Sequence, residues 1–317
     1  MVSVRIRIAT LVGVAGLGAV GGLEYGRARR AARRWRAPAG VHRRAAALAV
    51  RTLGDAGPPV VLLHGLVGSG VFWGAAYDGL AERHRLIVPD LLGFGASDRP
   101  NAGYGPDDHV QALIDCLDAL DLREPVALGA HSLGCLVALR LAATHPDRVA
   151  GIVGFGPPLY RDGADARARI GASGPMARLL ALPGPVAEHL CGWMCEHRDT
   201  AGHLAVLLNP GLPAAVAADA VQHNWISYSE TLTRVILDTD AAGWLDSVNT
   251  PITFVAGDRD PVVDLAFLDQ LTDSRPHVSV EVWPGGHDLP LVEPERCADT
   301  MARVLLRART DVAGHLS

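Results

Sequence analysis

The 317-residue sequence contains no lysine, so all 29 of its basic residues are arginine. We interpret this absence as a mark of genome composition rather than of chemistry. The arginines are unevenly distributed, because residues 1–44 carry a net charge of +9 and the rest of the chain −14, for a total of −5. An acidic body argues against nucleic acid as the main partner, since proteins that bind nucleic acid neutralise its phosphates with basic residues.

Cysteine is scarce, with five residues, an odd number, and no C-x-x-C pair. A disulfide framework is therefore not indicated, which favours a reducing compartment. Cys191 and Cys195 lie four residues apart near His189, His197 and His203, but a structural zinc site needs four ligands that converge from tight turns. We interpret the cysteines as small buried apolar residues, and we expect neither a metal nor a cofactor.

The chain also lacks an uncharged run long enough to span a bilayer comfortably. Residues 8–23 form an uncharged run of 16 residues, against the roughly 20 that a spanning helix needs. Arg5 and Arg7 precede it, and a denser group of arginines follows it. Three interpretations stay open: an uncleaved anchor that keeps the enzyme on the cytoplasmic side, a secretory signal without a clear A-x-A cleavage site, or a peripheral segment or misassigned start.

Residues 1–38 are accordingly expected to form an apolar segment, able to associate with a membrane through residues 8–23, and an Arg-rich linker. Because the denser positive flank follows the apolar run, we expect the enzyme in the cytoplasm or at the cytoplasmic face of the membrane. Secretion is not excluded by the sequence.

From residue 45 onward, short apolar runs alternate with helical patterns, which is typical of a parallel sheet with crossover helices. The clearest helix begins at Pro106, carries Asp107 and Asp108 in its first turn and repeats apolar residues at helical spacing. The expected strands occupy residues 60–63, 86–88, 126–128, 149–153, 252–255 and 278–282. The pattern predicts an α/β fold with a mostly parallel sheet.

The alternation breaks between about Pro158 and Trp244, where the sequence shows no convincing strand. Helical stretches are expected there at residues 176–182, 186–194, 201–208 and 214–237. We interpret residues 158–244 as a helical cap, inserted in a body formed by residues 39–157 and 245–312. Ligands of open α/β sheets bind beyond the carboxyl ends of the strands, so the cap is expected to cover the binding site.

Ser132 is the candidate nucleophile. The sequence Ala130-His131-Ser132-Leu133-Gly134 directly follows one expected strand and directly precedes a helical run. This is the small-x-nucleophile-x-small pattern of a strained strand-to-helix turn, whose neighbours must be small because the backbone is crowded. The turn would expose the Ser132 hydroxyl at a helix start, where free N–H groups stabilise negative charge. Simple capping of that helix by Ser132 is the alternative interpretation.

A serine nucleophile needs a base, and the base needs an orienting carboxylate. His287 follows the strand at residues 278–282, while Asp258 and Asp260 both follow the strand at residues 252–255. The carboxyl ends of parallel strands meet at one edge of the sheet, which is also the edge of Ser132. The order serine, acid, histidine therefore predicts a catalytic triad, and either aspartate could supply the acid.

The oxyanion hole is expected from two backbone N–H groups. Gly65, in His64-Gly65-Leu66 after the first expected strand, allows a sharp turn that points the Leu66 N–H into the site. Leu133, the residue after the nucleophile, supplies the second N–H. His64 and His131 are expected to bond to the backbone rather than to take part in chemistry.

Taken in order, HGLVGSG, DLLGFGASDRP, AHSLG, GDRDP and GGHDLPLVEPE resemble the α/β-hydrolase superfamily over about residues 45–310. The similarity is to its cap-bearing serine esterases, C–C bond hydrolases and haloperoxidase-like enzymes. The resemblance implies an eight-stranded, mostly parallel sheet flanked by helices, and a triad of Ser132, Asp260 and His287. In the family pattern the acid directly precedes a proline, which selects Asp260 and leaves Asp258 to the turn.

Three positions qualify this resemblance. Ala130 stands where the family usually has glycine, which is a tolerable change. Asp288 follows His287 where many C–C hydrolases have tryptophan, and this argues against that narrower activity. Asp98, in GFGASD, matches a loop turn of the family and is interpreted as structural.

The leading functional hypothesis is hydrolysis of a carboxylic ester or thioester through an acyl-enzyme. The alternatives are a C–C hydrolase or acyltransferase with the same triad, and a non-catalytic ligand-binding protein of this fold. A dehalogenase or epoxide hydrolase of this fold would have aspartate as nucleophile, whereas position 132 is serine. The apolar composition of the cap favours a small-molecule substrate with a lipophilic acyl group. The residues concerned are Leu179, Leu180, Leu182, Leu190, Trp193, Met194, Leu207, Leu208, Trp225 and Tyr228.

Overall fold

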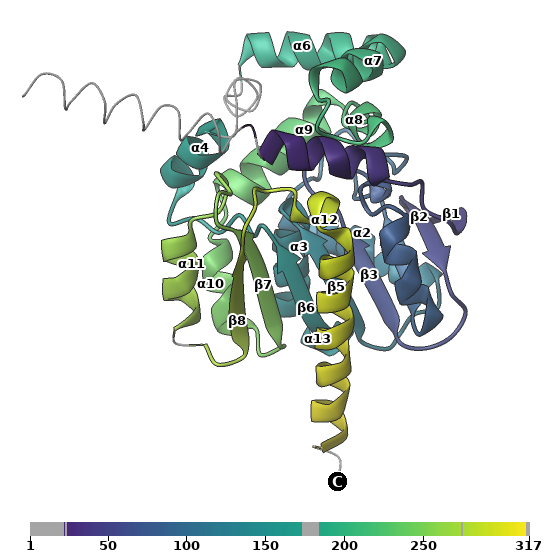
Figure 1. Cartoon of the computed structure of the whole chain (residues 1–317), viewed down its shortest axis with the longest axis vertical. Helices are drawn as coiled ribbons and strands as arrows, with labels where there is room; N and C mark the ends of the chain where they lie inside the picture. The colour runs from purple at the N-terminus through teal and green to yellow at the C-terminus, as the bar shows by residue number, and fades with distance from the viewer. Residues whose placement is uncertain (1–21, 23, 173–183, 274, 315–317) are drawn as a thin grey trace, which may run out of the picture.

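The computed structural model describes residues 22, 24–172, 184–273 and 275–314, and its strands form one eight-stranded sheet (Figure 1). The order across the sheet is β1-β2-β4-β3-β5-β6-β7-β8, with antiparallel pairing of β2 to β1 and β4 and parallel pairing elsewhere. The predicted mostly parallel α/β sheet is thereby confirmed. The strands are β1 (Val41–Ala45), β2 (Leu48–Leu53), β3 (Pro59–Leu63), β4 (Arg85–Pro89), β5 (Val126–His131), β6 (Val149–Phe155), β7 (Ile252–Gly257) and β8 (Val278–Trp283).

The six strands expected from apolar runs correspond to β3 through β8. Strands β3, β5 and β7 are buried along their whole length, because helices cover both faces of the sheet. Strands β1 and β2 did not stand out as apolar runs. They form an antiparallel hairpin at the edge of the sheet, and β1 is exposed at four of its five residues, so its sequence carries no continuous apolar signal.

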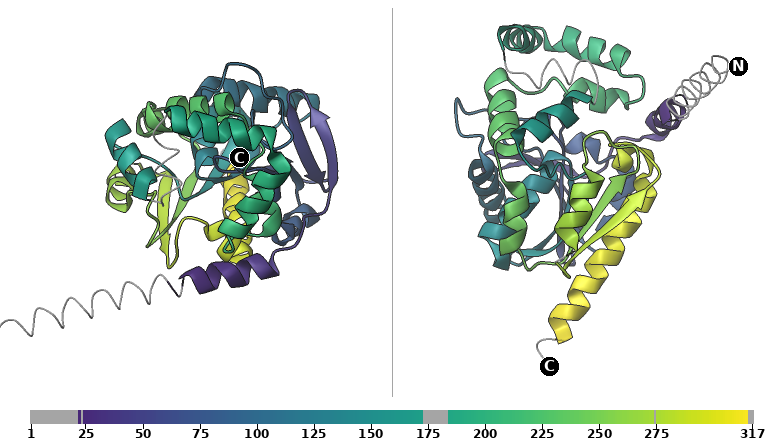
Figure 2. Two further views of the ribbon diagram at one scale, coloured as in Figure 1. Left: turned by 90° about the horizontal axis from the view of Figure 1, so that it is seen from above. Right: turned by 90° about the vertical axis from the view of Figure 1, so that its left-hand side faces the viewer.

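Two helical layers enclose the sheet (Figures 1 and 2). One buried core lies between the sheet and α2 (Pro106–Ala119), α3 (Leu133–Thr144) and α11 (Leu265–Thr272). The second lies on the other face, under the 3₁₀ helix η2 (Ala75–Glu82) and α13 (Pro294–Gly314). The remaining short elements of these layers are η1 (Gly70–Phe72), η3 (Pro146–Arg148) and α12 (Leu289–Val292).

Between β6 and β7, residues 158–172 and 184–244 contain no strand, as the sequence predicted, and their helices cover the carboxyl edge of the sheet (Figure 1). The expected helix at residues 176–182 lies outside the described residues. The stretch expected at 214–237 is interrupted, because Asn224 caps a new helix by accepting a 2.8 Å hydrogen bond from the Ser227 N–H. The division into body and cap domains stays a prediction. The elements here are α4 (Gly163–Ala172), α6 (Pro185–Glu196), α7 (Arg198–Leu208), α8 (Ala214–Asp219), α9 (Trp225–Thr231), the π-helix η4 (Leu232–Leu237), α10 (Ala241–Trp244) and η5 (Leu245–Ser247).

The Arg-rich stretch before β1 is a helix over residues 24–34 and is packed on the body, which a linker would not be. Arg27 pairs with Glu293 at 3.1 Å, and the Arg36 carbonyl accepts a 3.0 Å hydrogen bond from the Ala75 N–H. Trp35 packs against the core on the η2 side of the sheet.

No helix within the described part of the chain is long and apolar enough to cross a membrane. The candidate anchor at residues 8–23 lies outside the described residues, except for Gly22.

Candidate active site

Ser132 occupies a strained turn between β5 and α3. Its φ is positive, with φ 51° and ψ −118°, a conformation that a non-glycine residue adopts only where the surroundings enforce it. The crowding is visible at Gly134, where an added Cβ would come within 2.5 Å of the Leu63 carbonyl oxygen. Ala130, in contrast, is fully buried in the core with its methyl group accommodated, which explains why alanine is tolerated there.

His287 and Asp260 form a direct pair at the carboxyl ends of β8 and β7. The His287 Nδ1 donates to Asp260 Oδ2 at 2.8 Å, while Asp260 Oδ1 accepts a 2.8 Å bond from the Val262 N–H. The carboxylate is therefore held at both oxygens, and its side chain is fully buried.

Gly156, at the end of β6, makes room for this pair. It has a φ of 60°, and an added Cβ would lie 2.9 Å from His287 Nδ1 and 3.3 Å from Asp260 Oδ2. Sequence reasoning missed this residue. The available signal was a glycine three residues after the expected strand at residues 149–153, at the same edge as the other candidates.

The environment of His287 sets its protonation. Burial of the ring lowers the pKa of His287, but the hydrogen bond and charge of Asp260, with a smaller contribution from Asp288, outweigh burial and raise the pKa above its ordinary value. The pKa of Asp288 is also raised, in this case by burial, and the charge of Asp260 adds to the effect.

Asp258, the other acidic candidate, does not touch His287. Its Oδ1 accepts a 2.9 Å hydrogen bond from the Gly285 N–H, and its carboxylate pairs with Arg259 at the surface. Asp258 therefore holds the loop that precedes His287, while Asp260 contacts the imidazole itself.

His131 connects Ser132 to the histidine loop. Its ring stacks on Phe72 with centroids 4.6 Å apart and lies 4.8 Å from the His287 ring. Burial lowers the pKa of His131 well below its ordinary value, so the neutral ring donates its Nε2–H to the His287 carbonyl at 3.2 Å. Since Ser132 follows His131 in the chain, this contact brings the candidate nucleophile and base to one place.

The loop expected to supply one N–H of the oxyanion hole lies close to Ser132. Gly65 approaches so closely that an added Cβ would lie 3.2 Å from the Ser132 Cβ. His64 holds this turn, because its Nδ1 donates to the Gly65 carbonyl at 2.8 Å and its Nε2 accepts from the Leu91 N–H at 2.8 Å. Leu133 is the first residue of α3, and the N–H groups of a first turn have no partner within the helix.

An apolar cavity of about 290 Å³ opens at Ser132. The body and the region between β6 and β7 both contribute to its walls, so these helices do cover the candidate site. The lining residues are Leu66, Val67, Ser132, Pro158, Tyr160, Ile170, Tyr228, Leu232, Ile236 and Val262. Among the described residues, no group of three or more histidine, cysteine or acidic side chains is arranged to hold a metal ion.

Of the apolar cap residues singled out in the sequence, Tyr228 lines this cavity. Trp225 packs against the core on the α2 and α3 side. Trp193, Leu207 and Leu208 are exposed, whereas residues 179, 180 and 182 lie outside the described part of the chain.

Comparison with curated proteins finds relatives of diverse description. An uncharacterised protein of Mycobacterium tuberculosis is 26% identical over 267 residues, covering 80% of this chain and 76% of its own. "Probable lysophospholipase BODYGUARD 1" of Arabidopsis thaliana is 27% identical over 263 residues, covering 80% of this chain and 53% of its own. A haloalkane dehalogenase of Mesorhizobium japonicum is 42% identical over 99 residues, covering 31% of this chain and 32% of its own.

Solved structures agree on the fold. E-2-(acetamidomethylene)succinate hydrolase matches with a TM-score of 0.65 and 22% identity, covering 83% of this chain and 98% of that one. The bromoperoxidase of Bacillus anthracis matches with a TM-score of 0.65 and 24% identity, covering 81% and 95%. The family profile described as "alpha/beta hydrolase fold" matches residues 58–172, which include β3, Ser132 and the start of the region after β6. The chain therefore has the α/β-hydrolase fold, and residues 58–172 resemble the corresponding part of that family.

Proposed function

We propose that this protein is a serine hydrolase that cleaves a carboxylic ester or thioester of a lipophilic acyl group through an acyl-enzyme. Its relatives and its fold support a hydrolase. The observation that carries the finer proposal is the arrangement at one sheet edge. Ser132 lies on a strained turn at an apolar cavity. The hydrogen-bonded pair of His287 and Asp260 follows strands that end at the same sheet edge, and the His287 ring lies 4.8 Å from the ring of His131, the residue before Ser132.

In the proposed reaction, the Ser132 hydroxyl attacks the substrate carbonyl while His287 Nε2 accepts its proton. The Asp260 carboxylate keeps the other ring proton on Nδ1 and stabilises the imidazolium that forms. The N–H groups of Leu66 and Leu133 would bind the oxyanion, and removing one such donor typically costs about 3 kcal/mol of transition-state stabilisation. His287 then returns the proton to the leaving alcohol or thiol, and water deacylates Ser132 by the same route.

The cavity supports the choice of a lipophilic acyl group. Apart from Ser132 and the hydroxyls of Tyr160 and Tyr228, its walls are hydrocarbon. Each buried methylene contributes about 0.8 kcal/mol, so we expect kcat/KM to rise about fourfold per added methylene until the cavity is full. A series of p-nitrophenyl esters and acyl thioesters from acetyl upward measures this rise. A steady fall of kcat/KM with chain length would contradict the proposed selectivity.

The serine chemistry itself is tested by labelling. We expect a fluorophosphonate to modify the folded protein at Ser132 alone, because the pair of His287 and Asp260 activates this hydroxyl. Peptide mapping by mass spectrometry locates the label, and Ser132→Ala provides the matched control. Modification at another residue, or none on folded protein, would overturn the serine-hydrolase assignment.

We further propose that residues 8–23 associate with a membrane. The support is the uncharged run followed by arginines and the expectation that a lipophilic substrate concentrates there. Deleting residues 2–21 should lower the share of the protein in the membrane fraction of expressing cells without lowering kcat on a soluble ester. An unchanged share of the deleted form in the membrane fraction would contradict this role.

A further inference from the structure

The C-terminal end of α7 presents apolar side chains to solvent. Leu204, Leu207 and Leu208 are 42%, 73% and 71% exposed. They lie at positions i, i+3 and i+4, so they share one face of the helix. None of the three lines the cavity at Ser132. We call these three residues the leucine patch. Because they are exposed, they do not pack the helices that cover the site.

The leucine patch adjoins the helix at residues 24–34. An added Cβ at Gly211, three residues beyond Leu208, would lie 3.4 Å from the Ala28 Cβ. The view from above agrees, because the purple N-terminal helix runs beside the green-teal helices of residues 184–244 (Figure 2, left). The patch and this helix therefore belong to one continuous surface.

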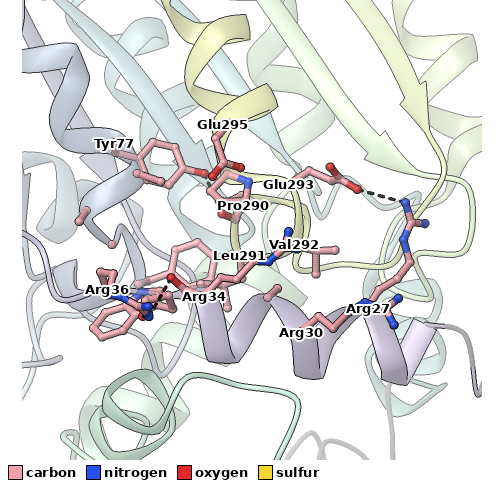
Figure 3. A pocket seen from close by; sticks show the side chains of 17 residues that line it. Arg27, Arg30, Arg34, Arg36, Tyr77, Pro290, Leu291, Val292, Glu293 and Glu295 are labelled. Atoms are coloured by element: carbon pink, nitrogen blue, oxygen red, sulfur yellow. Dashed lines mark hydrogen bonds and ion pairs between the residues drawn. The ribbon is translucent and has the colours of Figure 1, made fainter.

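The outer side of the N-terminal helix carries unneutralised positive charge. Arg29 and Arg33, one turn apart, are exposed and do not line the cavity between the helix and the body, and neither forms an ion pair with another described residue. Arg27, in contrast, is turned toward the body and pairs with Glu293 (Figure 3). We call Arg29 and Arg33 the arginine face.

A cavity of about 470 Å³ lies between this helix and the body (Figure 3). Its lining includes Arg30 and Arg34 from the helix and the apolar side chains of Phe72 and Leu291 from the body. Acidic groups are present as well, Glu293 and Glu295, which come from the body side. The cavity side of the helix therefore meets acidic groups of the body, whereas the arginine face points away from them.

We propose that the leucine patch and the arginine face together dock on a bilayer that contains anionic phospholipid. Apolar side chains next to arginines are the combination that binds at a membrane interface, since the former enter the acyl boundary while the latter attract the headgroups. The inference concerns described residues only, and it depends neither on residues 8–23 nor on the proposed catalytic activity.

The decisive measurement places a fluorophore on the patch of the full chain. Leu208→Cys is labelled with an environment-sensitive maleimide and mixed with vesicles that carry a spin-labelled quencher lipid, with or without phosphatidylglycerol. Ala119→Cys is the matched control, because this exposed residue ends α2 at the opposite, amino edge of the sheet. The native chain treated with the same reagent corrects for its five cysteines, of which four are buried.

We expect quenching at position 208, none at position 119, and a stronger effect with phosphatidylglycerol. Arginine near an anionic surface is worth about fivefold in binding, so Arg29→Glu with Arg33→Glu should weaken vesicle binding of the labelled chain about 25-fold or more. Arg83→Glu with Arg123→Glu, the same charge change on the amino edge, should have little effect.

Three results would overturn the docking proposal. The first is vesicle-bound protein whose fluorophore at position 208 is not quenched. The second is equal quenching at positions 119 and 208. The third is a blue-shifted, shielded fluorophore at position 208 before any lipid is added, which would indicate that a second copy of the chain covers the patch. Each is read without measuring hydrolysis, so failure here is distinct from failure of the serine-hydrolase proposal.

Discussion

Replacing Asp260 by asparagine tests the proposed triad at its most specific contact. Asp260 Oδ1 accepts from the Val262 N–H and Oδ2 accepts from His287 Nδ1, both at 2.8 Å. In Asp260→Asn the amide oxygen can keep the bond to Val262, so the amide NH₂ faces His287. Nδ1 must then accept a hydrogen bond, which moves the ring proton to Nε2 and leaves no lone pair there to receive the Ser132 proton.

The loss should fall on the chemical step. A wrong imidazole tautomer with intact geometry lowers kcat by about 10⁴, which corresponds to about 5.5 kcal/mol of transition-state stabilisation. KM should change little, because Asp260 does not line the cavity at Ser132. The assay is kcat and KM on an ester that the wild-type protein hydrolyses, with thermal unfolding to establish that the variant is folded.

Asp258→Asn is the matched control, since it makes the same chemical change two residues away. The asparagine oxygen can still accept from the Gly285 N–H, and only the exposed pair with Arg259 is lost, which is worth about 0–1 kcal/mol. We expect a small drop in Tm and a kcat near that of wild type. A folded but inactive Asp258→Asn, or a fully active Asp260→Asn, would refute the assignment of the acid.

Three further outcomes follow from the structure. Asp260 raises the pKa of His287 against the opposing effect of burial. Wild-type kcat/KM should therefore fall as pH drops through a pKa above about 6.5, and the residual activity of Asp260→Asn should persist to lower pH. If kcat/KM of wild type and Asp260→Asn fell at the same pH, the result would contradict this. Ile170→Trp should fill part of the cavity and lower kcat/KM for octanoyl relative to acetyl esters by about tenfold or more, whereas an unchanged ratio would show that the acyl chain binds elsewhere. Deleting residues 2–38 removes Trp35 and the pair of Arg27 with Glu293, so differential scanning calorimetry should show a Tm about 5 °C lower. Deletion of residues 2–21 should leave Tm unchanged. Equal Tm values for the two deletions would mean that the N-terminal helix does not stabilise the body.

The chain's organisation explains why the site is assembled at this edge. Strand β3 pairs with β4 on one side and with β5 on the other. After β3 the chain continues to β4 on one side, and it then crosses to the other side of β3 to form β5. The loops that follow β3 and β5 therefore run in opposite directions across the sheet and leave a crevice between them. Open α/β sheets bind ligands in this crevice. Leu66 and Ser132 lie on these two loops, and both line the cavity.

The sequence alone determined the features that depend on neighbours in the chain. Continuous apolar runs identified β3 through β7, because strands covered on both faces have no polar side. The edge strand β8 was recognisable although its valines alternate with Ser279 and Glu281. The elbow around Ser132 was recognisable because a strained turn requires small residues at fixed spacing. The edge strand β1 escaped this reasoning, since a strand facing solvent needs no apolar run. Strand β2 also escaped it, because Arg51 and Thr52 interrupt its apolar residues.

Only the tertiary structure decided what depends on residues distant in the chain. Asp258 and Asp260 are two residues apart on one loop, and their spacing alone cannot show that Asp260 meets His287 at 2.8 Å while Asp258 bonds to Gly285. The same holds for the arginines of residues 24–34. Their composition is that of a solvated linker, yet Trp35 and the pair of Arg27 with Glu293 hold this helix on the body. Contacts between segments more than 200 residues apart leave no periodicity in the sequence, because each segment carries only its own half of the interface.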